Sequence, residues 1–121
     1  MATKFRRIEV TIDQATNTLT SEIDLGKGGK LQGIYMPASW TTADLTLQAA
    51  SETGGTFLDV YDDAATEASI GAAASRYLSL YPDVFAGIRF IKIRSGTTAT
   101  PVQQGAARTL ILDIEINDGR V

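Results

Sequence analysis

The sequence predicts an all-β fold: a single antiparallel β-sandwich, jelly-roll-like, with about eight strands. Three observations support this prediction. Apolar and polar residues alternate with a period of two in one segment after another, as in strands with one buried face. No long stretch sustains the i, i+3, i+4, i+7 spacing of an amphipathic helix. Turn residues recur at intervals of about 8 to 12 positions, which is typical of a sandwich.

The first half of the chain contains five segments that are expected to form strands, each with alternating or β-prone residues: 8–12, 19–25, 31–36, 45–49 and 57–61. Polar residues at 13–17 predict the first turn, and glycines at 26–29 predict the second. Pro37 ends the third strand because it cannot donate a hydrogen bond to a sheet. The Ser-, Thr- and Gly-rich cluster at 51–56 predicts a hairpin turn.

The second half begins with an ambiguous segment. Residues 64–74 are rich in alanine and favour a helix on propensity alone, but Gly71 interrupts them, so we expect strand there. Aromatic and hydroxyl residues at 76–81 favour another strand. Residues 82–87 predict a turn or one short helical turn, with Gly87 able to adopt a positive φ.

Two further strands are expected at 88–94 and 110–116. The first is apolar on both faces at its centre, which predicts a central position in a sheet. The connection from Ser95 to Ala107 contains Gly96, Pro101 and Gly105, so no regular element is expected across it. Long loops in compact domains often make contacts. Within this loop we select four candidate assembly residues: Thr97, Thr98, Val102 and Gln103.

The composition limits the chemistry that the chain can perform. Its 121 residues bury about two-thirds of the unfolded surface, enough for one domain over 1–121 without disulfides. The sequence contains no His and no Cys. Ser-His-Asp and Cys-His nucleophiles, thiolate redox chemistry and the usual zinc, copper, haem and iron–sulfur ligands are therefore absent. We expect no enzymatic activity, no cofactor and no metal.

Charge and hydropathy disfavour two classes of partner. The chain has 11 Lys+Arg against 14 Asp+Glu, a net charge of -3, whereas nucleic-acid binding requires a clustered basic excess. The longest strictly apolar stretches are three residues long, as at 110–112, whereas a membrane span needs about 20. The N-terminus leads into an alternating strand and not a secretory signal. We therefore expect synthesis in a cytoplasm, with no nucleic acid and no membrane as partner.

Two motifs suggest ligand sites that their spacing does not support. The glycine-rich segment 26–30 lacks the Lys-Ser/Thr pair of a phosphate loop, because Leu31 and Gln32 follow Lys30. We interpret it as a flexible turn. The acidic group of Asp59, Asp62, Asp63 and Glu67 does not match a calcium loop or a paired-carboxylate glycosidase site, and we interpret it as a polar turn.

The N-terminus and one tryptophan are further candidates for assembly contacts. Lys4, Phe5, Arg6 and Arg7 form a short basic segment, either an N-terminal arm over 1–7 that reaches a neighbouring subunit or a solvated strand edge. Trp40 stands alone after Pro37. It is expected either to plug one end of the core or to contact a partner.

Six segments between about Lys30 and Leu112 are informative when taken together: 34–40 (IYMPASW), 45–51 (LTLQAAS), 56–62 (TFLDVYD), 85–96 (FAGIRFIKIRSG), 98–103 (TATPVQ) and 107–110 (ARTL). In these segments the chain resembles small structural proteins of tailed phages. Many relatives carry an aromatic residue where Ile88 stands and an Asp-Gly turn at 53–55. These relatives are β-sandwich proteins, usually encoded near the head genes and taken to be capsid decoration or cement proteins.

The resemblance implies a virion structural protein on the capsid exterior, which binds the outer surface of the major capsid protein shell. It also implies a homo-oligomer, with a trimer favoured. Two alternatives remain open. The turn at 49–57 and the strand at 76–78 are also similar to galactose-binding-like jelly rolls, which would imply a carbohydrate-binding module of a phage fibre or tail. The third possibility is a head-tail connector subunit.

Overall fold

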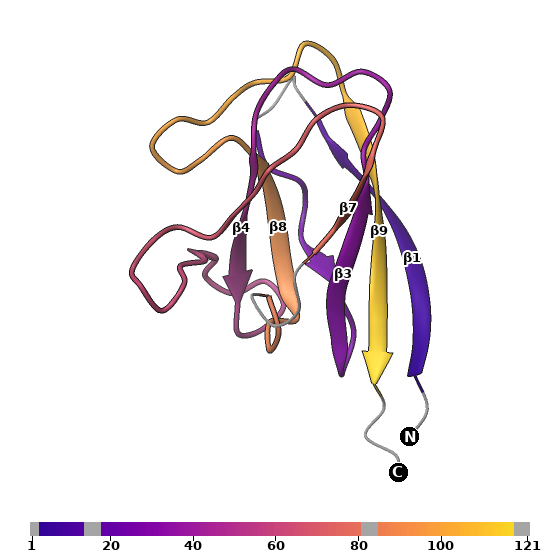
Figure 1. Cartoon of the computed structure of the whole chain (residues 1–121). Coiled ribbons are helices and arrows are strands. Elements are labelled where there is room, and N and C mark those ends of the chain that lie inside the picture. Colours follow the sequence, from indigo (N-terminus) through magenta and orange to yellow (C-terminus); the bar gives the residue numbers. More distant parts are fainter. Residues whose placement is uncertain (1–2, 14–17, 81–84, 118–121) are drawn as a thin grey trace.

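The computed structural model describes residues 3–13, 18–80 and 85–117, which form two antiparallel sheets packed face to face (Figure 1). The described residues contain nine strands and no helix, so the predicted all-β sandwich is confirmed, with nine strands where about eight were expected. The strands are β1 (Thr3–Ile12), β2 (Ile23–Asp24), β3 (Gly29–Tyr35), β4 (Leu45–Ala50), β5 (Leu58–Asp59), β6 (Ser69–Ile70), β7 (Tyr77–Ser79), β8 (Phe90–Ser95) and β9 (Arg108–Asn117).

The strand order is that of a jelly roll. Sheet A has the order β1-β9-β3-β7, and sheet B has the order β2-β8-β4-β5, with β6 also paired to β4. Apart from β4, β5 and β6, successive strands alternate between the two sheets, as expected for this topology. β8 lies between β2 and β4, which confirms the central position predicted from its apolar residues. None of the described segments forms a helix long and apolar enough to span a bilayer.

The core lies between the sheets and is built by the period-two alternation. Along the middle of β9 and in β8, every second residue points inward and has no exposed surface, including Leu110, Leu112, Ile91 and Ile93. Each such side chain stabilises the fold by about 1.5–3 kcal/mol through burial. Trp40 packs against this core and donates a hydrogen bond from Nε1 to the Ala43 carbonyl oxygen (3.0 Å), in agreement with the core-plug interpretation.

Several expected strands are shorter than predicted. Residues 19–25 run along β8, yet only β2 is regular, with isolated contacts such as the hydrogen bond from Thr20 N to Ile93 O (2.9 Å). In the alanine-rich segment only β6 is a strand, because a turn with a positive φ at Ala65 (62°) precedes it and a bend with a positive φ at Ser75 (58°) follows the segment. Gly87 adopts the predicted positive φ (85°). The expected turns at 13–17 and 82–87 lie partly outside the described residues.

Residues 3–7 belong to β1, which corrects the expectation of an arm over 1–7 for this part of the chain. β1 pairs with β9 in an unbroken register from Thr3–Asn117 to Ile12–Arg108. The alternation simply continues toward the N-terminus, with Phe5 and Arg7 on the outer face of sheet A. The strand-edge interpretation therefore holds for residues 3–7.

Candidate assembly surfaces

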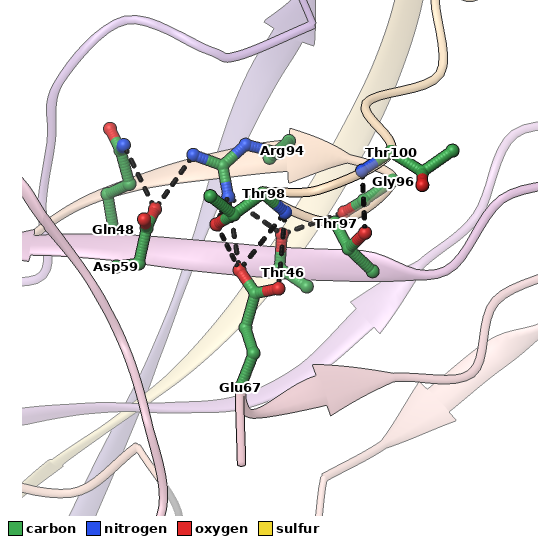
Figure 2. Close-up of polar contacts among 9 residues, drawn as sticks. All are labelled: Thr46, Gln48, Asp59, Glu67, Arg94, Gly96, Thr97, Thr98 and Thr100. Carbon is green, nitrogen blue, oxygen red and sulfur yellow. Dashed lines mark hydrogen bonds and ion pairs between the residues drawn. The ribbon is translucent and has the colours of Figure 1, made fainter. Parts of the chain in front are cut away.

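Arg94 is the centre of a buried polar network on the outer face of sheet B (Figure 2). It lies in β8, and the strand alternation turns it away from the core, where Ile91 and Ile93 point. Only 6% of Arg94 is exposed, because two acidic residues fold over it. Its Nη2 lies 2.8 Å from Asp59 Oδ1, and its Nη1 lies 3.2 Å from Glu67 Oε2. The guanidinium therefore joins β8 to β5 and to the segment that precedes β6.

Threonine hydroxyls complete the network. Arg94 Nη1 donates to Thr98 Oγ1 (2.9 Å) and to Thr46 Oγ1 (3.3 Å), and Thr98 Oγ1 donates to Glu67 Oε2 (2.6 Å). Thr46 Oγ1 in turn donates to the Gly96 carbonyl oxygen (2.7 Å). Within the described residues no buried side-chain nitrogen or oxygen lacks a hydrogen-bond partner. The network is thus fully satisfied, which a buried charged cluster requires to be tolerated.

Both acidic partners of Arg94 are held by hydrogen bonds within the fold. The hydrogen bond from Arg94 lowers the pKa of Asp59, against the opposing effect of burial. Glu67 also accepts a hydrogen bond from the backbone N–H of Thr98 (3.1 Å). Asp62 caps a turn, accepting from the N–H groups of Ala64 (2.8 Å) and Thr66 (3.0 Å). The acidic group thus forms the predicted turn and, in addition, a clamp on Arg94.

The loop from Ser95 to Ala107 is held in place at its tip and at its base. At the tip, Thr98 binds Glu67, while Thr97 and Thr100 bind each other through two hydrogen bonds of 3.0 and 3.1 Å. At the base, Gln104 is 1% exposed and bonds Thr41, Ser95 and Arg108 at 2.7–3.2 Å. Ordering a surface loop in advance removes an entropy cost that binding would otherwise incur.

The selected loop residues differ in exposure. Thr98 and Gln103 are exposed, whereas Thr97 and Val102 are half-buried. Val102 donates its backbone N–H to the Ser95 carbonyl oxygen (2.9 Å), so the loop doubles back on β8. Trp40 lies in the same region, since its neighbour Thr41 bonds Gln104. These candidates form one group at one end of the sandwich.

Lys4, Phe5, Arg6 and Arg7 lie at the opposite end of sheet A. They pair with residues 113–116, near the end of β9, whereas the loop joins the beginning of β9. A ten-residue strand spans about 30 Å, so the two groups cannot form one patch. Phe5 is 65% exposed, and Arg6 reaches across to sheet B, where its Nη2 donates to the Asp24 carbonyl oxygen (3.1 Å).

An aromatic patch on the outer face of sheet A includes Arg7. Tyr35 and Tyr77 are 38% and 41% exposed, with ring centroids 4.6 Å apart. Arg7 lies over the Tyr35 ring (5.6 Å) and forms an ion pair with Asp113 (3.6 Å). Tyr77 donates its hydroxyl to Asp113 (3.3 Å), and burial together with Asp113 raises its pKa. The patch offers flat apolar rings beside fixed polar groups.

The glycine-rich segment 26–30 forms the predicted turn. Gly29 N donates to Gly26 O (3.0 Å), and Gly26 and Gly28 adopt positive φ values of 87° and 74°. Beside the turn, Arg89 binds Asp24 through two contacts of 2.8 and 3.1 Å. A surface hollow of about 460 Å³ lies between this turn and residues 86–89. Nothing in its lining marks a phosphate site, because the turn opens into β3 and not into a helix.

Sequence reasoning missed Arg94 and the aromatic patch. The charge of Arg94 was a usable signal, because a charge in a strand that is expected to be buried needs partners, and the acidic group of residues 59–67 lies upstream. The aromatic patch had no local signal. Tyr35 and Tyr77 meet only because β7 pairs with β3.

No protein-family model and no curated protein sequence matches the chain. Among solved structures, the chain is similar to the crystal structure of SPBc2 prophage-derived protein YomS. The TM-score is 0.52 over 97% of this chain and 98% of that chain, at 14% sequence identity. At this identity the likeness is one of fold: a prophage-derived protein has a similar sandwich.

Proposed function

We propose that this chain is a structural protein of a tailed-phage particle and acts as a capsid decoration or cement protein. It is made in the host cytoplasm and binds the outer surface of the major capsid protein shell as a homo-oligomer. It works by assembly and not as an enzyme, and it takes neither nucleic acid nor membrane as partner. The similarity in fold to SPBc2 prophage-derived protein YomS supports the phage origin.

The main observation behind this proposal is the ordered loop from Ser95 to Ala107. A cement protein gains affinity from shape and buried area, and it loses affinity for every residue that binding must order. The Arg94 clamp at the tip and Gln104 at the base place the loop before any partner arrives. The net charge of -3 also favours the outside of the shell, because an acidic protein is not attracted to the DNA packaged inside.

Binding to capsids tests this proposal. Purified particles of the phage that encodes the chain should contain the polypeptide by mass spectrometry, and recombinant protein should rebind capsids that lack it. Ala99→Glu adds a charge at the exposed loop tip and should weaken rebinding, whereas Ala86→Glu, the same change at an exposed site at the other end, should not. Particles without the polypeptide would contradict the proposal. Cryo-EM density at the neck would favour the head-tail connector instead.

A carbohydrate-binding module is the second candidate, and the aromatic patch favours it. Exposed aromatic rings beside hydrogen-bonding groups, as at Tyr35, Tyr77 and Asp113, suit the stacking of a sugar ring. A glycan array with the isolated protein separates the two functions. Binding that is lost in Tyr35→Ala would support the module on a fibre or tail, whereas a cement protein should bind capsids and no glycan.

A further inference from the structure

β1 is a long edge strand, whereas the other edges of the two sheets are short. In the described part of the chain, β7 has three residues and β2, β5 and β6 have two each, but β1 has ten. An edge strand presents unpaired N–H and C=O groups to any strand that approaches it, and short edges limit this risk. β1 contains no proline, and its register with β9 contains no bulge. In Figure 1 it is the outermost strand of sheet A.

We propose that the β1 edges of two copies of this chain pair antiparallel about a two-fold axis at Ile8. The two copies of sheet A then form one continuous sheet. In this register Arg7 of each copy lies opposite Glu9 of the other, and Phe5 lies opposite Thr11. Aromatic residues and β-branched residues, like opposite charges, are favourable cross-strand pairs.

The charges of β1 select this register over its neighbours. In a continuous sheet the outer-face residues of one copy must meet outer-face residues of the other, so the axis passes through one residue. An axis at Arg7 would place Arg7 opposite itself, and an axis at Glu9 would place Glu9 opposite itself. Both arrangements oppose like charges, which destabilises a strand pair. The axis at Ile8 forms two Arg7–Glu9 pairs and overlaps nearly the whole strand.

The groups that this pairing uses are accessible. The Arg7 side chain and Phe5 are each 65% exposed. Glu9 is exposed, and its carboxylate has no partner among the residues that the structure describes. A hollow of about 360 Å³ lies beside β1, lined by residues 8–11 and residues 20–24. The second copy would cover Phe5, the second most exposed of the large hydrophobic side chains.

A two-fold strand pair is closed and gives a dimer, in place of the trimer that the phage resemblance implies. The pairing does not depend on the proposed function. A dimer that binds no capsid would contradict only the capsid role, whereas a monomer that binds capsids would contradict the pairing and the homo-oligomer but not the capsid role.

Sedimentation velocity over the micromolar range tests the pairing. The wild-type chain should reach the mass of two chains. By symmetry each substitution in β1 alters two contacts, so Arg7→Glu or Glu9→Arg should raise the dissociation constant about tenfold. The double variant Arg7→Glu/Glu9→Arg recreates both pairs with their charges exchanged and should restore the wild-type value to within a few-fold.

Controls separate this result from a loss of folding. Glu52→Arg makes the same charge change as Glu9→Arg at an exposed turn and should leave the dimer unchanged. Urea unfolding checks each fold, because Arg7 also contacts Asp113, whereas Glu9 does not. A monomer at all concentrations, a trimer, a dimer that neither single variant weakens, or a double variant that is not restored would each overturn the proposal.

Discussion

Replacing Arg94 with methionine is expected to be among the most damaging single changes in sheet B. Methionine fills part of the space but leaves Asp59 and Glu67 without a counter-charge, at side-chain exposures of 24% and 15%. Removing one partner of a buried ion pair costs about 3–5 kcal/mol. Because both carboxylates retain some contact with water, we expect a value near the lower limit, about 3 kcal/mol. This is a large part of the 5–15 kcal/mol that typically stabilises a domain.

Urea unfolding of matched variants measures this effect. Arg89→Met removes an arginine whose ion pair with Asp24 is about half exposed (47% and 48%), so its loss should be much smaller. Arg94→Met/Glu67→Gln should recover part of the stability, because it removes one of the two orphaned charges. If Arg94→Met destabilised the protein no more than Arg89→Met, the buried network would not stabilise the fold as argued.

Three further outcomes are expected, each measured by urea or thermal unfolding. A Cβ at Gly33 would overlap the Tyr77 ring, so Gly33→Ala should lower the free energy of unfolding by about 1–3 kcal/mol. Tyr77→Ala should destabilise the Gly33→Ala variant less than it destabilises the wild-type chain, because it removes the overlapping ring. Gly96→Ala should be destabilising, because its φ is +93° and its Cβ would lie 2.5 Å from Thr100 O, whereas Gly71→Ala meets nothing within 4 Å and should be tolerated. The lowered pKa of Asp59 means that its contribution to stability is complete above its ordinary value of 3.8 and is lost as the pH falls through the folded-state value. The stability of Asp59→Asn should therefore fall less as the pH is lowered. An unchanged loss of stability at low pH would contradict the role given to Asp59.

The sequence predicted the long strands because their pattern is local. Alternating or β-prone residues at 31–36, 45–49, 88–94 and 110–116 identify β3, β4, β8 and β9 without knowledge of any partner. The short strands depend on distant pairing. Residues 69–70 form β6 only because they pair with β4, and no local sequence pattern predicts that pairing.

The candidate contacts were predicted less completely. The loop was identified from its length and from the glycines and proline that prevent a regular element. Its order comes from Arg94, whose partners Asp59 and Glu67 lie 35 and 27 residues away in the sequence. The N-terminal segment was ambiguous because Lys4 and Arg6 occupy positions on the inward side of β1, where alternation predicts apolar residues. The structure accommodates Arg6 by directing its guanidinium to the Asp24 carbonyl oxygen.

The position of β9 between β1 and β3 governs when sheet A can form. β9 follows every other strand in the chain, yet it holds the first and third strands together. During synthesis, β1 and β3 must therefore wait, with their apolar faces uncovered, until residues 108–117 have left the ribosome. Such long-range pairing makes folding slow and exposes the nascent chain to aggregation. Sheet B can pair β2, β8 and β4 earlier, which gives the protein a defined order of assembly from one layer to the other.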